Sequence, residues 1–210
     1  MLTLYTTPLS ANGRKPLAVC RHLGLAPEIT TVNVYTGEGR APAYLAINPW
    51  GKVPTLVDGE FILWESNAIL QYLAEAHGDF RLSSRDPQRR ADIARWLFWE
   101  SSAWQPAFVP VLTDFVGALL VGARPPSPDA VRWDDVRLQP LLQFVDAHLR
   151  GREFLVGNAL SIADFSVGAM LMYVRPARFP FDRYANLAAW YARLEATDAW
   201  KATAAGPWAL

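Results

Sequence analysis

The chain has 210 residues, 51% of them hydrophobic, and carries 20 basic against 20 acidic side chains. An apolar content this high supports a buried core, and balanced charge without a basic stripe argues against a nucleic-acid partner. No apolar run is long enough to span a bilayer, and the N-terminus lacks a signal-peptide pattern. Cys20 is the single cysteine, which excludes an internal disulfide, so we expect a soluble cytoplasmic protein.

The first part of the chain, residues 1–77, predicts a small mixed sheet with helices packed against it. Four strands are expected, at residues 2–5, 28–34, 55–57 and 61–63. Asp58-Gly59 between the last two is typical of a hairpin with a type I′ turn. A short helix capped by Gly24 lies between the first two strands, which favours parallel pairing. A second helix follows the hairpin.

Residues 78–88 form a polar linker, in which Asp86 suits an N-cap and Pro87 the first helical position. Beyond it, residues 89–210 contain no convincing strand and predict an all-helical domain. Pro106 and Pro110 are expected to kink or end the first long helix of that domain.

The start of a later helix, in "NALSIADF", is specified in detail. Ser161 suits the N-cap and Asp164 can reach back to it as in a capping box, while Leu160 and Phe165 occupy the staple positions. We interpret this as a structural feature, worth about 1 kcal/mol from the cap.

The motifs exclude several kinds of chemistry. The three histidines stand alone without metal-ligand spacing, so no metal is expected, and neither a serine-hydrolase elbow nor a phosphate loop is present. Cys20 lies among apolar residues and is interpreted as a buried, inert thiol. The loop after the first strand instead offers hydroxyls and an amide, from Thr6, Thr7, Ser10 and Asn12.

Four stretches resemble the cytosolic glutathione S-transferases. "LYTTPLSAN" is similar to the first strand and loop of the serine-type classes, and "NPWGKVPTLVDG" and "LWESNAILQYL" to the glutathione-site core. "FLVGNALSIADF" is similar to the capping signature of the helical domain. The resemblance implies a thioredoxin-like N-terminal domain and an all-helical C-terminal domain that serves second-substrate binding and dimerisation. It leaves the class unassigned.

The resemblance also implies how glutathione would bind as co-substrate. Val53-Pro54 would be a cis peptide, and the backbone of Val53 would pair with the tripeptide as with an added strand. Ser66, with the helix that begins there, would meet the γ-glutamyl carboxylate, and Glu65 the ammonium. Arg40 and Lys52 are candidates for the glycine carboxylate. Taken singly, Glu65-Ser66 is also a plain helix cap and Lys52 a solvated side chain.

By the same resemblance Ser10 would stabilise the thiolate of glutathione by a hydrogen bond, although Ser10 is also an ordinary N-cap. Thr7 or Asn12 would share or replace that role. A hydrophobic electrophile would bind between the domains, against an apolar wall for which each candidate is alternatively a core residue. These candidates are Leu9, Phe108, Phe115, Phe179 and Trp208.

The leading function is therefore transfer of glutathione to hydrophobic electrophiles. Glutathione-dependent isomerase, dehalogenase, peroxidase and disulfide reductase activities stay open, as does a non-catalytic binding or scaffold role. A homodimer is expected from the resemblance and from the aromatic helix "RWLFWESSAW", because aromatic residues are enriched at interfaces. Glu100 of that helix is expected near the dimer seam.

Overall fold

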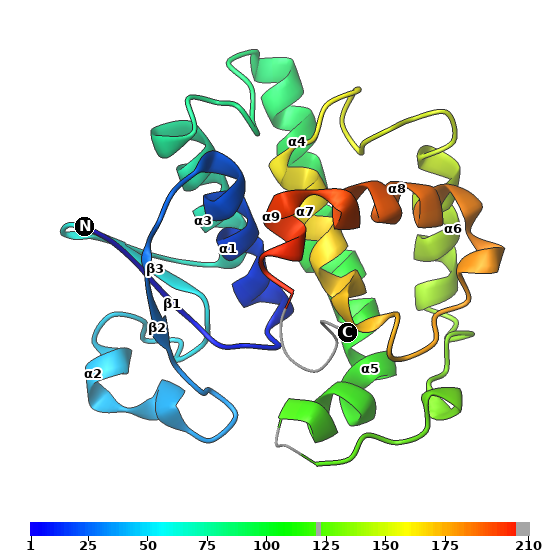
Figure 1. Cartoon of the computed structure of the whole chain (residues 1–210), viewed down its shortest axis with the longest axis horizontal. Helices are drawn as coiled ribbons and strands as arrows, with labels where there is room; N and C mark the ends of the chain where they lie inside the picture. The colour runs from blue at the N-terminus through cyan, green and yellow to red at the C-terminus, as the bar shows by residue number, and fades with distance from the viewer. Residues whose placement is uncertain (121–122, 205–210) are drawn as a thin grey trace. The chain divides into compact units, whose positions relative to one another are not determined.

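The computed structural model describes residues 1–120 and 123–204, which fall into two compact units (Figure 1). Unit 1 comprises Met1–Ser83 together with helix α9 (Asp198–Lys201), and unit 2 comprises Ser84–Thr197. The division lies within the stretch 78–88. The sequence gives no sign that α9 returns to unit 1, because four residues carry too little periodicity to assign a face.

Unit 1 is built on a four-stranded sheet in the order β2-β1-β3-β4. Its strands are β1 (Leu2–Thr6), β2 (Glu28–Thr31), β3 (Thr55–Asp58) and β4 (Phe61–Trp64). The pairing of β1 with β2 is parallel, and β3 pairs antiparallel with both β1 and β4. The mixed sheet predicted from the sequence is confirmed.

The hairpin turn differs in detail from the type I′ turn expected at Asp58-Gly59. Asp58 pairs with Phe61, so the two loop residues are Gly59 and Glu60. Of these two, only Gly59 has a positive φ, 59°. A positive φ at the first central residue alone is the pattern of a type II′ turn, which requires glycine there and matches strand twist equally well.

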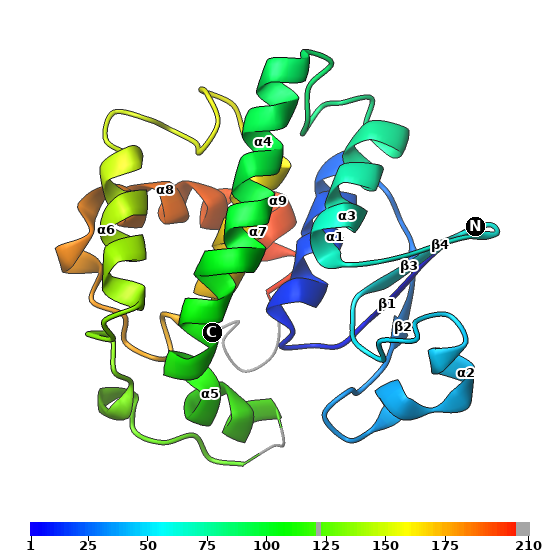
Figure 2. The ribbon, with the colours of Figure 1, turned by 180° about the vertical axis from the view of Figure 1, so that it is seen from behind.

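The core of unit 1 lies between the sheet and two of the helices of this unit. The helices of unit 1 are α1 (Ala11–Leu23), α2 (Pro42–Leu45), α3 (Ser66–Tyr72) and α9, and α3 continues as a π-helical turn, Leu73–His77. Helices α1 and α3 lie side by side (Figures 1 and 2). The cross-strand pair Leu4–Leu56 and the α3 residues Ile69 and Leu70 are fully buried, so the core lies between the sheet and these two helices.

Unit 2 contains only helices among the residues that the structure describes, as predicted (Figure 2). The α-helices are α4 (Pro87–Trp99), α5 (Gln105–Leu120), α6 (Leu138–His148), α7 (Ile162–Ala169) and α8 (Ala185–Ala196). Short 3₁₀ segments occur at Pro128–Ala130, Met170–Tyr173 and Phe181–Arg183. Every residue of α7 is buried, so α7 forms the centre of this unit.

The two prolines do not end the long helix as the sequence suggested. Between α4 and α5 the chain stays helical through a π-helical turn, Glu100–Trp104, which directly precedes Pro106 in the first turn of α5. Pro110 lies inside α5. A π-turn is a common way for a helix to absorb a local mismatch in backbone bonding, so it explains why the chain continues.

The predicted capping box at the start of α7 is present and is larger than expected. Oδ2 of Asp164 accepts hydrogen bonds from the Ser161 N–H at 2.9 Å and the Ser161 hydroxyl at 3.0 Å. Its Oδ1 accepts from the Leu155 N–H at 2.9 Å and from Trp190 Nε1 at 2.8 Å. Burial raises the pKa of Asp164, and these four donors oppose that rise. The carboxylate therefore joins three segments of unit 2.

The aromatic helix predicted at a dimer seam contributes mostly to the core. Trp96 and Trp104 are buried, and Trp104 Nε1 donates to the Val167 carbonyl at 3.0 Å. Glu100 is fully buried, with the Ser166 hydroxyl 3.4 Å from its Oε2, and its place near a dimer seam stays a prediction. Phe98, 71% exposed, is the aromatic residue of this helix that faces outward.

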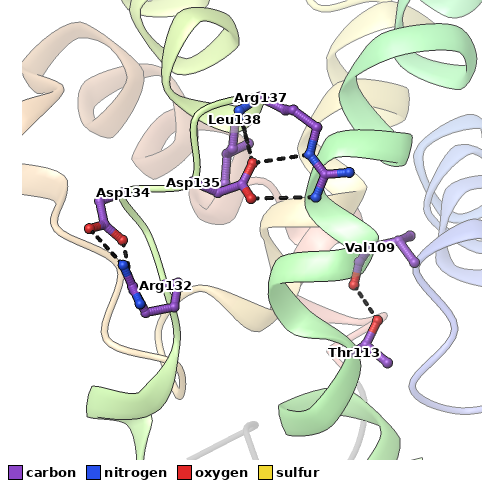
Figure 3. A network of polar contacts seen from close by, with 7 residues as sticks. All are labelled: Val109, Thr113, Arg132, Asp134, Asp135, Arg137 and Leu138. Atoms are coloured by element: carbon purple, nitrogen blue, oxygen red, sulfur yellow. Dashed lines mark hydrogen bonds and ion pairs between the residues drawn. The ribbon is translucent and has the colours of Figure 1, made fainter.

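The surface of unit 2 also carries a group of local polar contacts (Figure 3). Arg132 pairs with Asp134, and Arg137 with Asp135, each within two residues in sequence. The Thr113 hydroxyl donates to the Val109 carbonyl at 2.6 Å within α5. Exposed ion pairs contribute little to stability because solvent screens them, and we do not treat this group as a candidate site.

Candidate functional site

Ser10 lies where β1 leads into α1 and caps that helix. Its Oγ accepts a hydrogen bond from the Gly13 N–H at 3.1 Å, and its own N–H donates to the Thr7 carbonyl at 3.3 Å. Ser10 is 8% exposed. The cap uses a lone pair of the hydroxyl and leaves its proton to be donated, so capping and hydrogen bonding to a ligand are compatible roles.

The segment before Ser10, from the end of β1 onward, carries two features that the sequence did not reveal. Leu9 has a φ of 66°, a left-handed conformation that is uncommon for a branched residue. Thr6 is buried, and its Oγ1 has no hydrogen-bond partner among the residues that the structure describes. A buried polar atom in this condition is uncommon and costs stability.

The Val53-Pro54 peptide bond is cis, as the resemblance implied. The segment before it is held by two side chains that sequence analysis did not single out. Tyr44 donates its hydroxyl to the Lys52 carbonyl at 2.6 Å, and Asn48 Nδ2 donates to the same carbonyl at 2.8 Å. Both side chains also lie 2.9 Å from Thr55 Oγ1, which fixes the entry into β3.

Glu65 and Ser66 lie at the junction between β4 and α3. Glu65 has φ 73° and ψ 110°, and its side chain is exposed. A non-glycine residue in such a conformation costs on the order of 1–3 kcal/mol and is found mainly at functional positions. Ser66 begins α3, is 7% exposed, and donates its hydroxyl to Asn12 Oδ1 over 3.4 Å. The hydrogen bond brings Asn12 and Ser66, both predicted site residues, together.

Lys15 is the residue at this junction that sequence analysis missed. It lies on α1, is fully buried, and its Nζ is 3.4 Å from both Ser66 Oγ and Asn67 Oδ1. A lysine in a helix that also carries exposed polar residues gives no sequence signal of burial. Only the packing of α1 against α3 reveals it.

Arg40 and Lys52 belong to two loops that touch through a pair of glycines. A Cβ on Gly39 would lie 2.3 Å from the Gly51 carbonyl oxygen, and a Cβ on Gly51 would lie 2.6 Å from the Gly39 carbonyl oxygen. Each cation directly follows one of these glycines, and both side chains are exposed. Lys52 Nζ lies 5.2 Å from the centroid of the Trp50 ring, within the range of a cation–π contact.

Cys20 does not belong to this group of residues. Its side chain is 1% exposed, and burial raises the pKa of its thiol to about 12. A thiol in that state is not a nucleophile at neutral pH.

The predicted second-substrate residues belong to separate parts of the chain. Leu9 is half-buried in unit 1, whereas Phe108 and Phe115 are buried on α5 of unit 2. The rings of Phe108 and Trp104 are 4.6 Å apart between centroids, and those of Phe179 and Trp133 are 4.9 Å apart, as in core packing. Trp208 lies outside the described residues.

The described residues lack the features of a membrane span and of a metal site. No helix there combines the length and the apolar content needed to cross a membrane. No group of three or more His, Cys, Asp or Glu side chains in the described part of the chain is arranged to hold a metal ion.

Comparison with known proteins identifies the family. Residues 1–75 match the family model of the glutathione S-transferase N-terminal domain, and residues 128–193 match that of the C-terminal domain. A probable glutathione S-transferase of Oryza sativa subsp. japonica is 32% identical over 197 residues, which cover 93% of this chain and 92% of that protein. The chain belongs to the glutathione S-transferase family. The prediction of a glutathione transferase enzyme is thereby confirmed.

Solved structures of other transferases resemble this one closely. The theta class glutathione S-transferase from the citrus canker pathogen Xanthomonas axonopodis pv. citri, with glutathione bound, is 30% identical with a TM-score of 0.85. That match covers 97% of this chain and 96% of that chain. Glutathione transferase F7 from Populus trichocarpa is 27% identical with a TM-score of 0.85, covering 97% and 98%. Because the two TM-scores are equal, structural similarity does not assign this transferase to a class.

Proposed function

We propose that this transferase binds glutathione in unit 1, ionises its thiol to the thiolate, and directs the thiolate at hydrophobic electrophiles. The observation that carries the proposal is the state of Ser10. Its hydroxyl caps α1 through a lone pair and keeps a proton to donate to sulfur. The relative from Xanthomonas axonopodis pv. citri, solved with glutathione bound, supports the choice of ligand.

The tripeptide is held as an added strand against the backbone of Val53, next to Pro54. Its γ-glutamyl carboxylate meets the Ser66 hydroxyl and its ammonium meets the exposed carboxylate of Glu65. The strained backbone of Glu65 supports this assignment, because such conformations concentrate at binding sites. Arg40 and Lys52, brought near each other by the contact between Gly39 and Gly51, bind the glycine carboxylate.

The chemistry requires a thiolate. A free thiol has a pKa near 8.5, so only a few per cent of it is ionised at neutral pH. A hydroxyl that donates to sulfur stabilises the anion, as does the N-terminus of α1. The thiolate then attacks the electrophilic carbon, forms the carbon–sulfur bond and expels the leaving group with its electron pair.

The electrophile binds beside the sulfur, where Leu9 of unit 1 offers an apolar side chain. Conjugation of hydrophobic electrophiles assigns the protein to detoxification. A cytoplasmic location belongs to the same proposal, because glutathione is abundant where cellular thiols are kept reduced. The enzyme acts as a homodimer, which the exposed aromatic side chain of Phe98 supports.

The decisive experiment is a titration of thiolate absorbance in the enzyme–glutathione complex, with wild type beside Ser10→Ala and Ser10→Thr. A hydrogen bond to a charged acceptor is worth about 1.5–3 kcal/mol, equivalent to one to two pKa units. Ser10→Ala therefore raises the thiol pKa by that amount while glutathione still binds, and turnover recovers partly in alkaline buffer. Ser10→Thr keeps a hydroxyl and the cap, and leaves the titration close to wild type.

If the titration curves of wild type and Ser10→Ala coincide, the role of Ser10 is limited to helix capping. Thr7, Asn12 or the N-terminus of α1 would then carry the ionisation. Absence of glutathione binding by the wild-type enzyme would instead overturn the proposal as a whole.

A further inference from the structure

The side chain of Lys15 brings a positive charge into the interior of unit 1, directly under Ser66. Lys15 is 0% exposed, and its Nζ is 3.4 Å from the Ser66 hydroxyl oxygen and 3.4 Å from Asn67 Oδ1. Ser66 in turn donates its proton to Asn12 Oδ1 over 3.4 Å. The hydroxyl is thus positioned between a cation, toward which it turns a lone pair, and an amide oxygen, toward which it turns its proton.

Burying an ammonium group is costly, because the charge loses its hydration. A methionine of similar length would fill the same space between α1 and α3 without that cost. A fully buried lysine beside a hydroxyl is therefore expected to persist where its charge is used.

We propose that Lys15 is a positioning residue that makes the site selective for ligands with a free α-carboxylate. The inference rests on the proposed glutathione site and adds a buried residue that contacts Ser66 and does not touch the ligand. Lys15 acts in two ways. Its donated hydrogen bond polarises Ser66 and turns the hydroxyl proton away from α1. Its charge lowers the electrostatic energy of a carboxylate that binds on the other side of Ser66.

The hydroxyl of Ser66 can exchange its hydrogen bond to Asn12 for one to a bound carboxylate. At 3.4 Å the bond from Ser66 to Asn12 is longer than the usual O–H···O distance, so it is readily replaced by a shorter bond to a carboxylate. The contact from Lys15 uses a different side of the Ser66 oxygen and is kept. The site therefore gains a charge-assisted bond on binding without moving its buried cation.

The test uses two ligands that differ only at the group that Lys15 is proposed to recognise. One is glutathione, and the other is 4-aminobutyryl-cysteinylglycine, which lacks the α-carboxylate. Lys15→Met removes the charge with little change of volume. Arg21→Met is the matched control, because Arg21 lies on the same helix α1, carries the same charge and is exposed. Dissociation constants are measured by titration calorimetry.

Lys15→Met is expected to weaken glutathione binding roughly tenfold, and to change the affinity for the analogue less than twofold. Arg21→Met leaves both affinities within twofold of wild type. Equal loss of affinity for both ligands would reduce Lys15 to a structural residue, and unchanged glutathione affinity would also overturn the inference. If wild type fails to bind glutathione, the proposed function fails first, so the two failures are distinguishable.

A measurement on the wild-type protein keeps the inference testable if Lys15→Met fails to fold. The ¹⁵N resonance of the Lys15 side chain is followed during titration with each ligand. Glutathione is expected to shift it, because the carboxylate strengthens the hydrogen-bond chain through Ser66, whereas the analogue leaves it in place. Equal shifts with both ligands, or none with glutathione, would contradict the assignment.

Discussion

The side-chain hydroxyl of Thr6, at the end of β1, is buried. We expect it to stabilise the fold no more than a methyl group in its place would. Its Oγ1 is without a hydrogen-bond partner in the described part of the chain. Thr55, at the start of β3, is equally buried, but its Oγ1 lies 2.9 Å from both the Tyr44 hydroxyl and Asn48 Nδ2. The two threonines are therefore a matched pair, alike in burial and strand position and different in polar contacts.

Replacing each threonine by the isosteric valine should have opposite effects on stability. Thr6→Val is expected to raise the free energy of unfolding by about 1 kcal/mol, because it removes an unsatisfied polar atom. Thr55→Val is expected to lower it by about 1–3 kcal/mol, because Tyr44 and Asn48 lose a partner. Urea denaturation measures both values. A Thr6→Val protein that unfolds more easily than wild type would show that this hydroxyl has a role in the folded state.

Glu65 illustrates a conflict between stability and binding at a single residue. Its backbone is left-handed, with φ 73°, where glycine is unstrained. Glu65→Gly is therefore expected to relieve backbone strain and to stabilise the fold by about 1 kcal/mol. The greater entropy of a glycine in the unfolded chain reduces this gain. The same change removes the carboxylate proposed to meet the ammonium of glutathione. Its affinity should fall by roughly one to two decades.

Glu65→Ala separates the two effects, since alanine keeps the strain and loses only the carboxylate. We expect calorimetry to give the same weakened affinity for both variants, with thermal melting showing the gain in stability for glycine alone. If both variants bind glutathione like wild type, Glu65 is a plain junction residue, the alternative left open by the sequence.

At the scale of elements, the turn between β3 and β4 is tied to α3 through Asp58. Asp58 Oδ2 accepts hydrogen bonds from the Tyr72 hydroxyl at 2.8 Å and lies 2.8 Å from His77 Nε2. These contacts lower the pKa of Asp58, with the Tyr72 hydrogen bond as the largest cause and the His77 contact next. The hairpin turn is thus fastened to the end of α3 by a carboxylate in its ionised form.

This fastening should depend on pH in a defined direction. Because the folded pKa of Asp58 is lowered, its contribution is complete above the unfolded value of about 3.9 and is lost as pH falls through the folded pKa. Tyr72→Phe should therefore destabilise the protein at pH 7 by about 1.5–3 kcal/mol, and by less at pH 3. Urea unfolding at both pH values measures the difference.

Tyr184→Phe is the matched control, because the Tyr184 hydroxyl donates to a neutral acceptor, Gln139 Oε1, at 3.0 Å. Its destabilisation should be the same at both pH values. If the Tyr72→Phe penalty is also independent of pH, the hydrogen bond does not require the ionised form of Asp58.

Sequence patterns predicted the strands of unit 1 and a helix start in unit 2 because strands, turns and helix caps depend on local signals. The apolar runs around Asp58-Gly59 and the capping box at Ser161 each depend on residues within a few positions of one another. The hairpin register escaped prediction by one residue, since both Gly59-Glu60 and Asp58-Gly59 satisfy the same composition rule. Continuation of the helix through Pro106 was missed because a π-turn has no simple sequence pattern.

The predictable part of the site consists of the residues that the family resemblance marks, such as Ser10, Pro54 and Ser66. Lys15 and Tyr44 could not be found in this way. Lys15 contacts Ser66 because α1 packs on α3, and Tyr44 contacts Lys52 because α2 lies close to the loop that contains Lys52. Burial of a lysine and the partner of a tyrosine hydroxyl are properties of tertiary packing, and one sequence alone carries no record of them.

At the scale of the whole molecule, the residues proposed to bind glutathione belong to unit 1, where the N-terminal family model matches. Unit 2 has a core rich in aromatic rings, yet it leaves Phe98 on α4 71% exposed. An aromatic ring of that exposure, on a helix that buries Trp96 on its other side, is a suitable interface residue. We therefore assign Phe98 to the proposed homodimer contact.

Light scattering at micromolar concentration is expected to give twice the mass of one chain for wild type. Phe98→Glu should shift the protein toward monomer, because a carboxylate buried in an interface loses its hydration without gaining a partner. Val136→Glu is the control, since Val136 is 81% exposed and lies in unit 2 outside its α-helices. It should leave the mass unchanged. A dimer that survives Phe98→Glu would move the interface elsewhere, and a monomeric wild type would overturn the dimer itself.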